Sequence, residues 1–473
     1  MSKLRIGDEL PGLLGPALER LERGFAGLPE CSTASDTVEQ RQSMDAVLGE
    51  VADRLVDNYP YFHPLYAGQM LKPPHPVAQA AYALAMTLNP NNHARDGGRA
   101  SSEMEIEAVA GIAGMFGWAS TQGTSGSSNE QPGGFLGHLT SGGTFANLEA
   151  LWVAGQLARG KRVLASTQAH YTHKRITAVL GIPFGEVASD GRGRMDLNAL
   201  EDELRCGDVG TVVVTMGTTA LGAVDPLPEI LALRERYGFR VHLDAAYGGY
   251  FRLIAGALDE PARRAFEAMN AADSMVIDPH KHGLQPYGCG CVLFRDASVG
   301  RFYKHDSPYT YFTSGELHLG EISLECSRAG AAAVALWATQ RMLPLVCFGE
   351  AGDEFARGLA AGRRAALDLD GRLREDDRFE PLPGGPELDI VVWRVKADSD
   401  GESSRRAQAI FDEAARRDLH LALVQLPQAF FAVDGGRRDA DGMVTCLRSV
   451  LMKPEHEGWL DAIWERLSAA AEV

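Results

Sequence analysis

The chain is poor in several features that would assign its class at once. Its seven cysteines among 473 residues are sparse and odd in number, without the paired spacing of metal ligands or of a disulfide framework. It has no uninterrupted run of about 18 apolar residues, the length needed to span a bilayer. It also lacks an apolar signal core at its start. We therefore expect a cytoplasmic protein without a membrane span.

Basic residues are also scarce relative to acidic ones. Lys and Arg total 46 against 63 Asp and Glu, giving a formal charge of -17. Nucleic acid and anionic membranes are therefore poor partners, because both bind basic surfaces. His280 and His282 form a His-x-His pair without a third ligand nearby, so we expect no metal site.

Secondary-structure patterns alternate from about residue 135 onward. Short β-branched runs predict strands at 162–166, 211–216, 240–244, 274–277 and 290–294, and longer helical patterns predict helices at 144–158, 227–237 and 260–269. Such alternation predicts an α/β domain with a largely parallel sheet, whose ligand site lies at the carboxyl ends of the strands.

Three segments of different character divide the chain. Residues 1–95 read as an N-terminal arm with one helix at about 36–55, and residues 96–345 form the large α/β domain. A helix should follow Arg328 and run to about Met342. Residues 346–473 then predict a smaller C-terminal α+β domain, with strands at 389–395 and 443–451 and a helix at about 404–417.

The run Ser141-Gly-Gly-Thr-Phe-Ala-Asn147 opens the helix predicted at 144–158. Gly142, Gly143 and Thr144 would lie at its amino end, where free backbone N–H groups and the helix dipole favour a phosphate. Glycine allows close backbone approach, and the threonine hydroxyl adds a donor. The same residues are also an ordinary helix start.

Lys281 follows a short apolar strand, in the run Ser274-Met-Val-Ile-Asp-Pro-His-Lys-His-Gly283. A lysine becomes a useful nucleophile when desolvation or a neighbouring cation lowers its pKa, and it can then form a Schiff base with a carbonyl or with pyridoxal phosphate. An isolated lysine in such a turn is more often simply solvated.

Two polar residues upstream also follow predicted strands. Asp244 ends the strand 240–244, where an unpaired carboxylate would be costly, and a protonated pyridine nitrogen would be a suitable partner. It could instead cap the next helix. His170 follows the strand ending at Ser166 and could stack on a flat cofactor, or be an ordinary hydrogen-bonded loop residue.

Taken in order, five motifs resemble the pyridoxal-phosphate-dependent decarboxylases of group II, which include the aromatic amino acid, glutamate and tyrosine decarboxylases. They are Ser141-Gly-Gly-Thr-Phe-Ala-Asn147, Gln168-Ala-His170, Gly217-Thr-Thr219, His242-Leu-Asp-Ala-Ala-Tyr247 and Asp278-Pro-His-Lys281. The resemblance covers roughly residues 100–345, and the run Cys446 to Pro454 resembles the family's C-terminal strand. It implies the fold type I (aspartate aminotransferase-like) α/β architecture and a homodimer.

The resemblance also implies a set of roles. Lys281 would hold the internal aldimine, Asp244 would pair with the pyridine nitrogen, and His170 would stack on the ring. The phosphate would be held by Gly142, Gly143 and Thr144, with Asp278 and His280 close to it, while Thr219 would lie near Asp244 and Ala246 would pack the ring's other face.

The reaction so implied is decarboxylation of an L-amino acid to the amine and carbon dioxide. In the family a tyrosine on a loop after the lysine protonates the α-carbon; here Tyr309 and Tyr311 are the candidates, and Tyr311 is preferred. Two aromatic residues that pack the loop are the alternative. Arg328 could bind a substrate carboxylate or phosphate, or hold a helix start.

Further alternatives concern the reaction and the N-terminal arm. A more distant resemblance to sphingosine-phosphate lyase leaves carbon–carbon bond cleavage open, and a non-catalytic phosphate-binding protein is a third possibility. The stretches Tyr61 to Tyr66 and Leu88 to His93, with His63 and His93, either line the substrate pocket or clasp a dimer.

Overall fold

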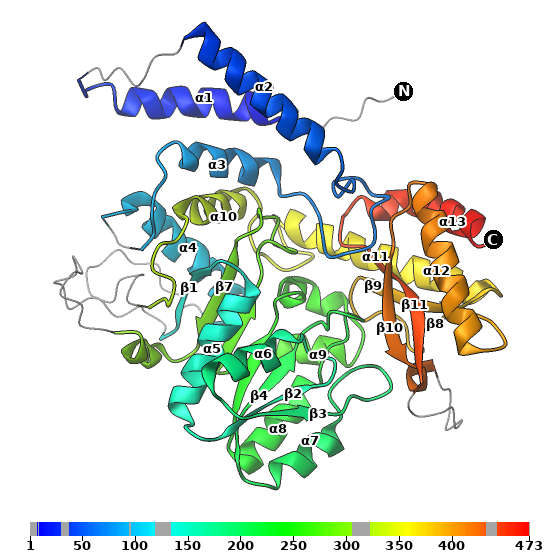
Figure 1. Cartoon of the computed structure of the whole chain (residues 1–473). Coiled ribbons are helices and arrows are strands. Elements are labelled where there is room, and N and C mark those ends of the chain that lie inside the picture. Colours follow the sequence, from blue (N-terminus) through cyan, green and yellow to red (C-terminus); the bar gives the residue numbers. More distant parts are fainter. Residues whose placement is uncertain are drawn as a thin grey trace.

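The structure is a computed structural model that describes residues 7, 9–29, 37–93, 96–118, 134–304, 322–431 and 442–472. Two β-sheets organise it, a large one in the middle of the chain and a smaller one near the C-terminus (Figure 1). Tyr309 and Tyr311 lie outside the described residues. Among the residues described, no helix is long and apolar enough to cross a membrane.

The large sheet has seven strands in the order β1-β7-β6-β5-β4-β2-β3. Their bounds are β1 Leu136–Thr140, β2 Arg162–Ser166, β3 Phe184–Val187, β4 Val209–Thr215, β5 Arg240–Asp244, β6 Ser274–Ile277 and β7 Gly290–Phe294. Strand β7 runs in the opposite direction to the other six strands, so its pairs with β1 and β6 are antiparallel. The prediction of a largely parallel sheet is therefore confirmed, although β1 and β3 were not predicted.

Burial explains why these segments form strands. Every residue of β4 and β7 is buried, as expected for apolar, β-branched runs covered by helices on both faces. The helices of this unit are α4 Arg99–Met115, α5 Gly143–Leu157, α6 Thr172–Leu180, α7 Leu197–Leu204, α8 Leu227–Tyr237, α9 Ala262–Glu267 and α10 Gly330–Met342, with 3₁₀ segments at Gly249–Ala257, Met269–Ala271 and Ala297–Phe302.

The helix predicted at 260–269 was wrong in extent. Helix α9 covers only Ala262–Glu267, and Met269 begins a separate 3₁₀ turn. Pro261 lacks an N–H and so cannot continue a helix from Glu260. Met269 is fully buried, so tertiary packing determines the chain direction there.

The smaller sheet is antiparallel, in the order β10-β11-β9-β8. Its strands are β8 Phe379–Pro381, β9 Ile390–Val395, β10 Ala422–Pro427 and β11 Met443–Val450, and its helices are α11 Glu354–Glu375, α12 Asp400–Arg416 and α13 His456–Ala470, with a 3₁₀ turn at Gln428–Phe431. Trp393 of β9 is fully buried in its core. The domain boundary near residue 346 stays a prediction; it falls between α10 and α11.

The N-terminal helices are α1 Glu9–Gly24, α2 Val38–Leu55 and α3 Pro76–Met86. Helix α2 confirms the helix predicted at about 36–55, and Thr37 begins it with a capping box to Gln40. Neither α1 nor α2 has a buried residue, and both extend beyond the body of the molecule (Figure 1). Exposed apolar side chains of α2 include Met44, Val47, Leu48, Val51 and Leu55.

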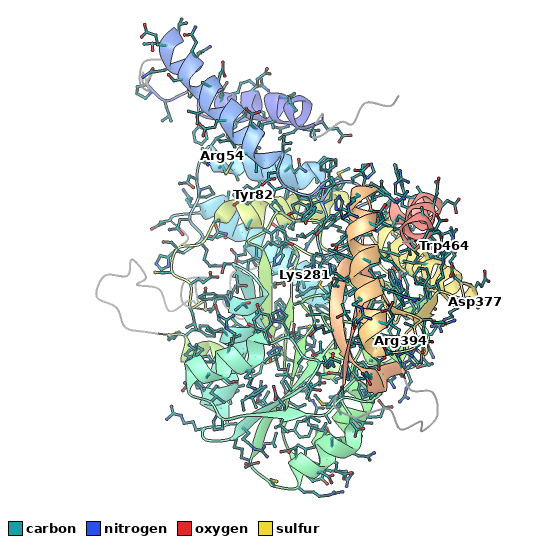
Figure 2. All side chains as sticks on the ribbon, turned by 45° about the vertical axis from the view of Figure 1, so that its right-hand side comes forward. Arg54, Tyr82, Lys281, Asp377, Arg394 and Trp464 are labelled. Carbon is teal, nitrogen blue, oxygen red and sulfur yellow. The ribbon has the colours of Figure 1, made fainter. Side chains whose placement is uncertain are left out.

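The parallel strands of the large sheet end at one edge. Asp244 is the last residue of β5 and Thr215 the last of β4, and Lys281 follows β6 after a short turn. Figure 2 shows Lys281 well inside the outline of the molecule, far from Arg54 on the N-terminal arm. The polar residues predicted from the sequence therefore meet at this edge.

Candidate functional site

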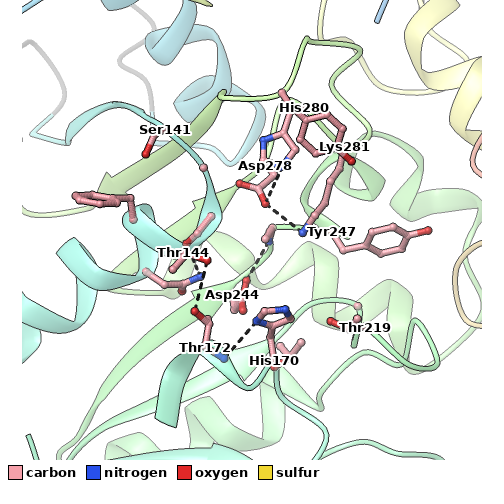
Figure 3. A pocket seen from close by; sticks show the side chains of 18 of the residues that line it. Ser141, Thr144, His170, Thr172, Thr219, Asp244, Tyr247, Asp278, His280 and Lys281 are labelled. Carbon is pink, nitrogen blue, oxygen red and sulfur yellow. Dashed lines mark hydrogen bonds and ion pairs between the residues drawn. The ribbon is translucent and has the colours of Figure 1, made fainter. Parts of the chain in front are cut away.

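A cavity of about 440 Å³ lies at the carboxyl edge of the large sheet (Figure 3). All residues predicted to contact the cofactor line it, namely Gly142, Gly143, Thr144, His170, Thr219, Asp244, Ala246, Asp278, His280 and Lys281. They come from segments up to 139 positions apart (281 less 142). The five motifs thus fold into one site. Tyr311 is outside the described residues.

The amino end of α5 forms a cradle at one wall of this cavity. Gly142 precedes the helix with a φ of 152°, and no side chain caps the helix start. A Cβ on Gly143 would lie 2.6 Å from Asp278 Oδ2, and one on Gly290 would lie 2.5 Å from the carbonyl carbon of Gly142. Only glycine fits this spacing, and an uncapped helix start of this kind binds anions.

A buried hydrogen-bonded chain supports the cradle from behind. Asn147 Nδ2 donates to the carbonyl of Gly143 across 2.9 Å, and His242 Nε2 donates to Asn147 Oδ1 across 2.8 Å. His242 Nδ1 lies 2.9 Å from the Ser274 hydroxyl, which donates to it. Burial lowers the pKa of His242 to about 3, so the ring is neutral and this pattern of donors is fixed. The sequence did not single out His242 or Asn147 for this task.

Asp244 is paired with a histidine that the sequence reading missed. His173 Nε2 lies 2.8 Å from Asp244 Oδ2 and both side chains are buried, at 1% and 7% exposure. Burial alone would raise the pKa of Asp244, but the hydrogen bond and charge of His173 outweigh burial and hold that pKa well below its usual range. Asp244 is therefore an ionised carboxylate in the cavity wall. The available signal was the spacing His170-x-x-His173 at the start of a helix.

His170 is held as a neutral ring. The backbone N–H of Thr172 donates to His170 Nδ1 across 3.3 Å, which leaves the ring proton on Nε2. Burial lowers the pKa of His170; the charge of Asp244 opposes this shift, and the charge of Lys281 adds to it. A neutral imidazole in the cavity wall can pack flat against an aromatic ligand, and it adds no positive charge beside that ligand.

Lys281 is partly buried, with 23% of its side chain exposed, and its Nζ lies 3.1 Å from Asp278 Oδ2. His280 Nδ1 donates to the carbonyl of Cys289 across 2.7 Å, and its Nε2 lies 3.6 Å from the same Asp278 oxygen. Cys289 and Cys291 are buried. Asp278 Oδ1 is buried and has no hydrogen-bond partner among the described residues. The turn after β6 therefore presents one amine beside one carboxylate.

Arg448 of β11 also reaches the site, and the sequence reading did not identify it. Its Nη2 donates to the carbonyl of Thr219 across 2.7 Å, and its Nε donates to the carbonyl of Ala220 across 3.1 Å. Arg448, Thr219 and His170 also line a neighbouring cavity of about 400 Å³. The C-terminal unit thus fixes the loop that carries Thr219.

Arg328 does not line the cavity. Its Nη1 donates to Glu105 Oε1 and to the carbonyl of Leu139, each across 2.6 Å. Of the two predicted tasks, the structure supports a structural one, since Arg328 joins α4 and β1 just before α10. His63 and His93 are also absent from the cavity wall, so the structure does not support the substrate-pocket reading of the N-terminal stretches.

The cavity fits pyridoxal phosphate. It combines an uncapped helix start that only glycine can form, an ionised carboxylate at Asp244 and the amine of Lys281. A phosphate, a protonated pyridine nitrogen and an aldehyde need these three partners respectively.

Comparison with known proteins points the same way. Residues 32–396 match the pyridoxal-dependent decarboxylase conserved domain. An L-tyrosine decarboxylase of Enterococcus faecium is 28% identical over 410 residues, which cover 66% of this chain and 65% of that enzyme. An L-2,4-diaminobutyrate decarboxylase of Rhizobium meliloti is 39% identical over 182 residues, 35% of each chain. The chain thus spans just under two thirds of the Enterococcus enzyme.

Solved structures show the same fold. The Oryza sativa protein TDC, crystallised with PLP and tryptamine, superposes with a TM-score of 0.75 at 17% identity, covering 100% of this chain and 99% of that one. A sphingosine-1-phosphate lyase of Burkholderia pseudomallei superposes with a TM-score of 0.70 at 20% identity, covering 95% and 94%. These likenesses confirm the fold type I architecture, which both proteins share.

Proposed function

The chain belongs to the pyridoxal-dependent decarboxylase family, and we propose that it decarboxylates an L-amino acid to the amine and carbon dioxide. The observation that carries the proposal is the meeting of Lys281, Asp244 and the α5 cradle in one cavity. Relatives named as tyrosine, aspartate and diaminobutyrate decarboxylases support the substrate class.

The cofactor is pyridoxal phosphate, and we assign its contacts from the cavity wall. Lys281 attaches it, Asp244 pairs with the ring nitrogen, and His170 and Ala246 pack against the ring. Its phosphate is held by Gly142, Gly143 and Thr144 at the start of α5. Thr219, Asp278 and His280 complete the wall. When bound, the cofactor supplies a cationic ring that withdraws the electron pair left when the carboxylate departs.

Each protein group then has a task that follows from its charge. Asp244 is ionised and so holds a proton at the ring nitrogen, with His173 as its second partner. Asp278 provides a counter-charge for Lys281 Nζ before the amine is used. His170 is neutral and fills one face of the site.

Proton delivery to the α-carbon is assigned to Tyr311, with Tyr309 as the alternative. Both tyrosines belong to the segment that follows Tyr303, and the structure does not describe them. Their assignment stays a prediction that rests on the resemblance alone.

The direct test is carbon dioxide release. Purified protein with pyridoxal phosphate is incubated with each of the common L-amino acids, and Lys281→Ala serves as the control. We expect release from at least one amino acid with the wild type and none with the variant. No release from any amino acid would contradict the proposal.

A carbon–carbon lyase is the second candidate, because the sphingosine-1-phosphate lyase shares the fold. Trapping a released aldehyde with a hydrazine reagent separates the two reactions. A non-catalytic phosphate-binding protein is the third candidate, but phosphate binding alone does not require Lys281, Asp244 and His170 in one cavity. Absence of a visible absorption band after addition of pyridoxal phosphate would favour it.

We also propose a homodimer in the cytoplasm. The exposed apolar side chains of α2 support the dimer, because an apolar helix face needs a partner. The six described cysteines are free thiols, which supports a reducing compartment. Light scattering measures the oligomeric state, and cell fractionation the location.

A further inference from the structure

A buried polar network lies behind the cofactor lysine, outside the residues assigned above. Its members are Tyr247 from the turn after β5, His282 from the turn after β6, and Asp389 from the residue before β9. Their exposures are 3%, 1% and 1%. Buried polar groups at this depth must satisfy one another, because water does not reach them.

Asp389 is the centre of the network. The Tyr247 hydroxyl donates to Asp389 Oδ1 across 2.5 Å, and His282 Nε2 lies 2.8 Å from Asp389 Oδ2. His282 Nδ1 lies 3.0 Å from the backbone carbonyl of Tyr247. One carboxylate thus holds two segments that are 35 residues apart (282 less 247).

The protons of this network can be counted. The carbonyl of Tyr247 only accepts, so His282 Nδ1 carries a proton. Burial alone would raise the pKa of Asp389, but the charge and hydrogen bond of His282 and the hydrogen bond of Tyr247 outweigh it and lower that pKa. Asp389 is therefore ionised, and it is paired with His282 across 2.8 Å in the interior.

The remaining charges around Asp389 agree with this count. The charge of Lys72 also lowers the pKa of Asp389. Burial lowers the pKa of Arg448, and the charge of Asp389 opposes that shift. Burial, followed by the charge of Asp389, raises the pKa of Tyr247 well above its usual value. The hydroxyl therefore stays protonated and remains a donor to Asp389.

The network includes one residue from each of two turns that carry site residues. Tyr247 lines the cavity together with Lys281, and it follows Asp244 by three positions. His282 is the next residue after Lys281. Asp389 belongs to the C-terminal unit. The turn that carries the cofactor lysine and the turn after Asp244 are therefore both hydrogen-bonded to the C-terminal unit.

We propose that Asp389 is a positioning residue for the cofactor: by pairing with His282 and accepting the Tyr247 hydroxyl, it fixes from the C-terminal unit the two turns between which the cofactor is held. The inference rests on the proposed function, since it concerns the same cavity. It assigns no chemical step to Asp389, which is not among the residues lining the cavity.

Two substitutions separate the hydrogen bonds of Asp389 from its charge. Asp389→Ala leaves the His282 nitrogen and the Tyr247 hydroxyl without their partner. Asp389→Asn can keep every bond, because its Oδ1 accepts from Tyr247 and its Nδ2 donates to a neutral His282 that keeps the proton on Nδ1. Asp370→Ala is the matched control, since it removes a carboxylate that pairs with Arg374 in the same unit and does not line the cavity.

The measurement is the dissociation constant of pyridoxal phosphate, obtained by titrating its visible absorption, together with the fraction retained on Lys281 after borohydride reduction. We expect Asp389→Ala to weaken cofactor binding roughly 10- to 100-fold, the effect of losing hydrogen bonds to a charged group. Asp389→Asn should stay within about threefold of the wild type, because the bonds can be remade.

Thermal unfolding of the same proteins separates positioning from general stability. A purely structural role would lower the melting temperature of Asp389→Ala, as in Asp370→Ala, and leave the cofactor dissociation constant of both at the wild-type value. That result would overturn the proposal. Where Asp389→Ala does not fold, Tyr247→Phe removes only the hydroxyl, and cofactor binding equal to the wild type would overturn it equally.

Failure of the proposed function would look different. A wild-type protein that binds pyridoxal phosphate at Lys281 but releases no carbon dioxide from any amino acid contradicts decarboxylation. The cofactor dissociation constants of the Asp389 variants would still be measurable and would still decide the positioning role.

Discussion

His173 Nε2 lies 2.8 Å from Asp244 Oδ2, and this buried pair joins the start of α6 to the end of β5. The pair keeps Asp244 ionised without a bound ligand, since its pKa stays well below its usual range despite burial. Asp244 is thus prepared to hold a proton on a ligand nitrogen. A carboxylate without such a partner would favour its protonated form when buried.

Replacing His173 should therefore lower the rate of carbon dioxide release while leaving pyridoxal phosphate bound in the cavity. We expect His173→Phe to lower the rate of carbon dioxide release roughly 10- to 100-fold, because Asp244 loses a hydrogen bond to a charged group. His173→Gln, which still donates a hydrogen bond, should lose less. His420→Phe, a histidine that does not line the cavity, is the control, and a wild-type rate in His173→Phe would contradict the role.

Gly143→Ala tests the cradle. The added Cβ would lie 2.6 Å from Asp278 Oδ2, so either the helix start or Asp278 must move out of place. We expect weaker binding of pyridoxal phosphate, by at least about tenfold, measured by absorption titration. Gly371→Ala is the matched control, because nothing lies within 4 Å of its Cβ position. Equal affinities in the two variants would disprove the close fit.

Arg328 should matter for stability and not for substrate. It pairs with Glu105, and the two side chains are 6% and 2% exposed. Arg328→Met leaves a buried charge unpaired, which costs about 3–5 kcal/mol in unfolding free energy, measured by chemical denaturation. Arg328→Met with Glu105→Gln should recover part of this loss.

The exposed pair Arg341 and Glu107 is the control for Arg328. Arg341→Met should cost less than about 1 kcal/mol. A raised KM for the amino acid in Arg328→Met, at unchanged stability, would instead indicate that Arg328 binds substrate.

The apolar face of α2 should hold two copies of the chain together. Met44, Val47, Leu48, Val51 and Leu55 recur at the spacing of one helix face and are all exposed. We expect Val47→Asp with Val51→Asp to shift the mass measured by light scattering toward the monomer. Gln42→Asp on the same helix is the control. A wild-type mass in both variants would place the interface elsewhere.

The free energy of unfolding should fall at acidic pH because His242 takes up a proton when the chain unfolds. Burial lowers the pKa of its folded form to about 3, whereas an unfolded histidine titrates near 6.5. Between these values the unfolded chain binds more protons, so stability falls as the pH falls from about 6.5 toward 3, by up to about 1.4 kcal/mol per pH unit for this residue. The contribution is constant above pH 6.5.

Urea unfolding at pH 7, 6 and 5 checks this dependence against His242→Gln, which should lose stability less steeply. Comparing the two proteins removes groups of opposite sign such as Asp225, whose pKa burial raises to about 7. Parallel slopes for wild type and variant would contradict the assignment.

Local sequence patterns were sufficient for the central strands and for the residues at their ends. Strands β2, β5, β6 and β7 have the bounds predicted for them, because continuous apolar runs flanked by glycine and polar residues have few other stable conformations when buried. Parallel strands then place their carboxyl ends at one edge, which is why Asp244 and Lys281 could be expected in one site.

Long-range contacts could not be anticipated in the same way. The only local mark of His173 is its spacing from His170, and Arg448 and Asp389 carry none, since an aspartate before an apolar strand or an arginine within one fits many structures. Their partners lie 71, 229 and 107 positions away respectively. Only the folded chain shows which buried charge has a counterpart.

Strand order and side-chain chemistry along the chain were enough to expect a lysine, an aspartate and a glycine-rich helix start at the edge of a parallel sheet. Which protons these groups carry followed only from the folded chain. Protonation depends on burial and on neighbouring charges, and both arise only when distant segments such as Asp389 and His282 pack against each other.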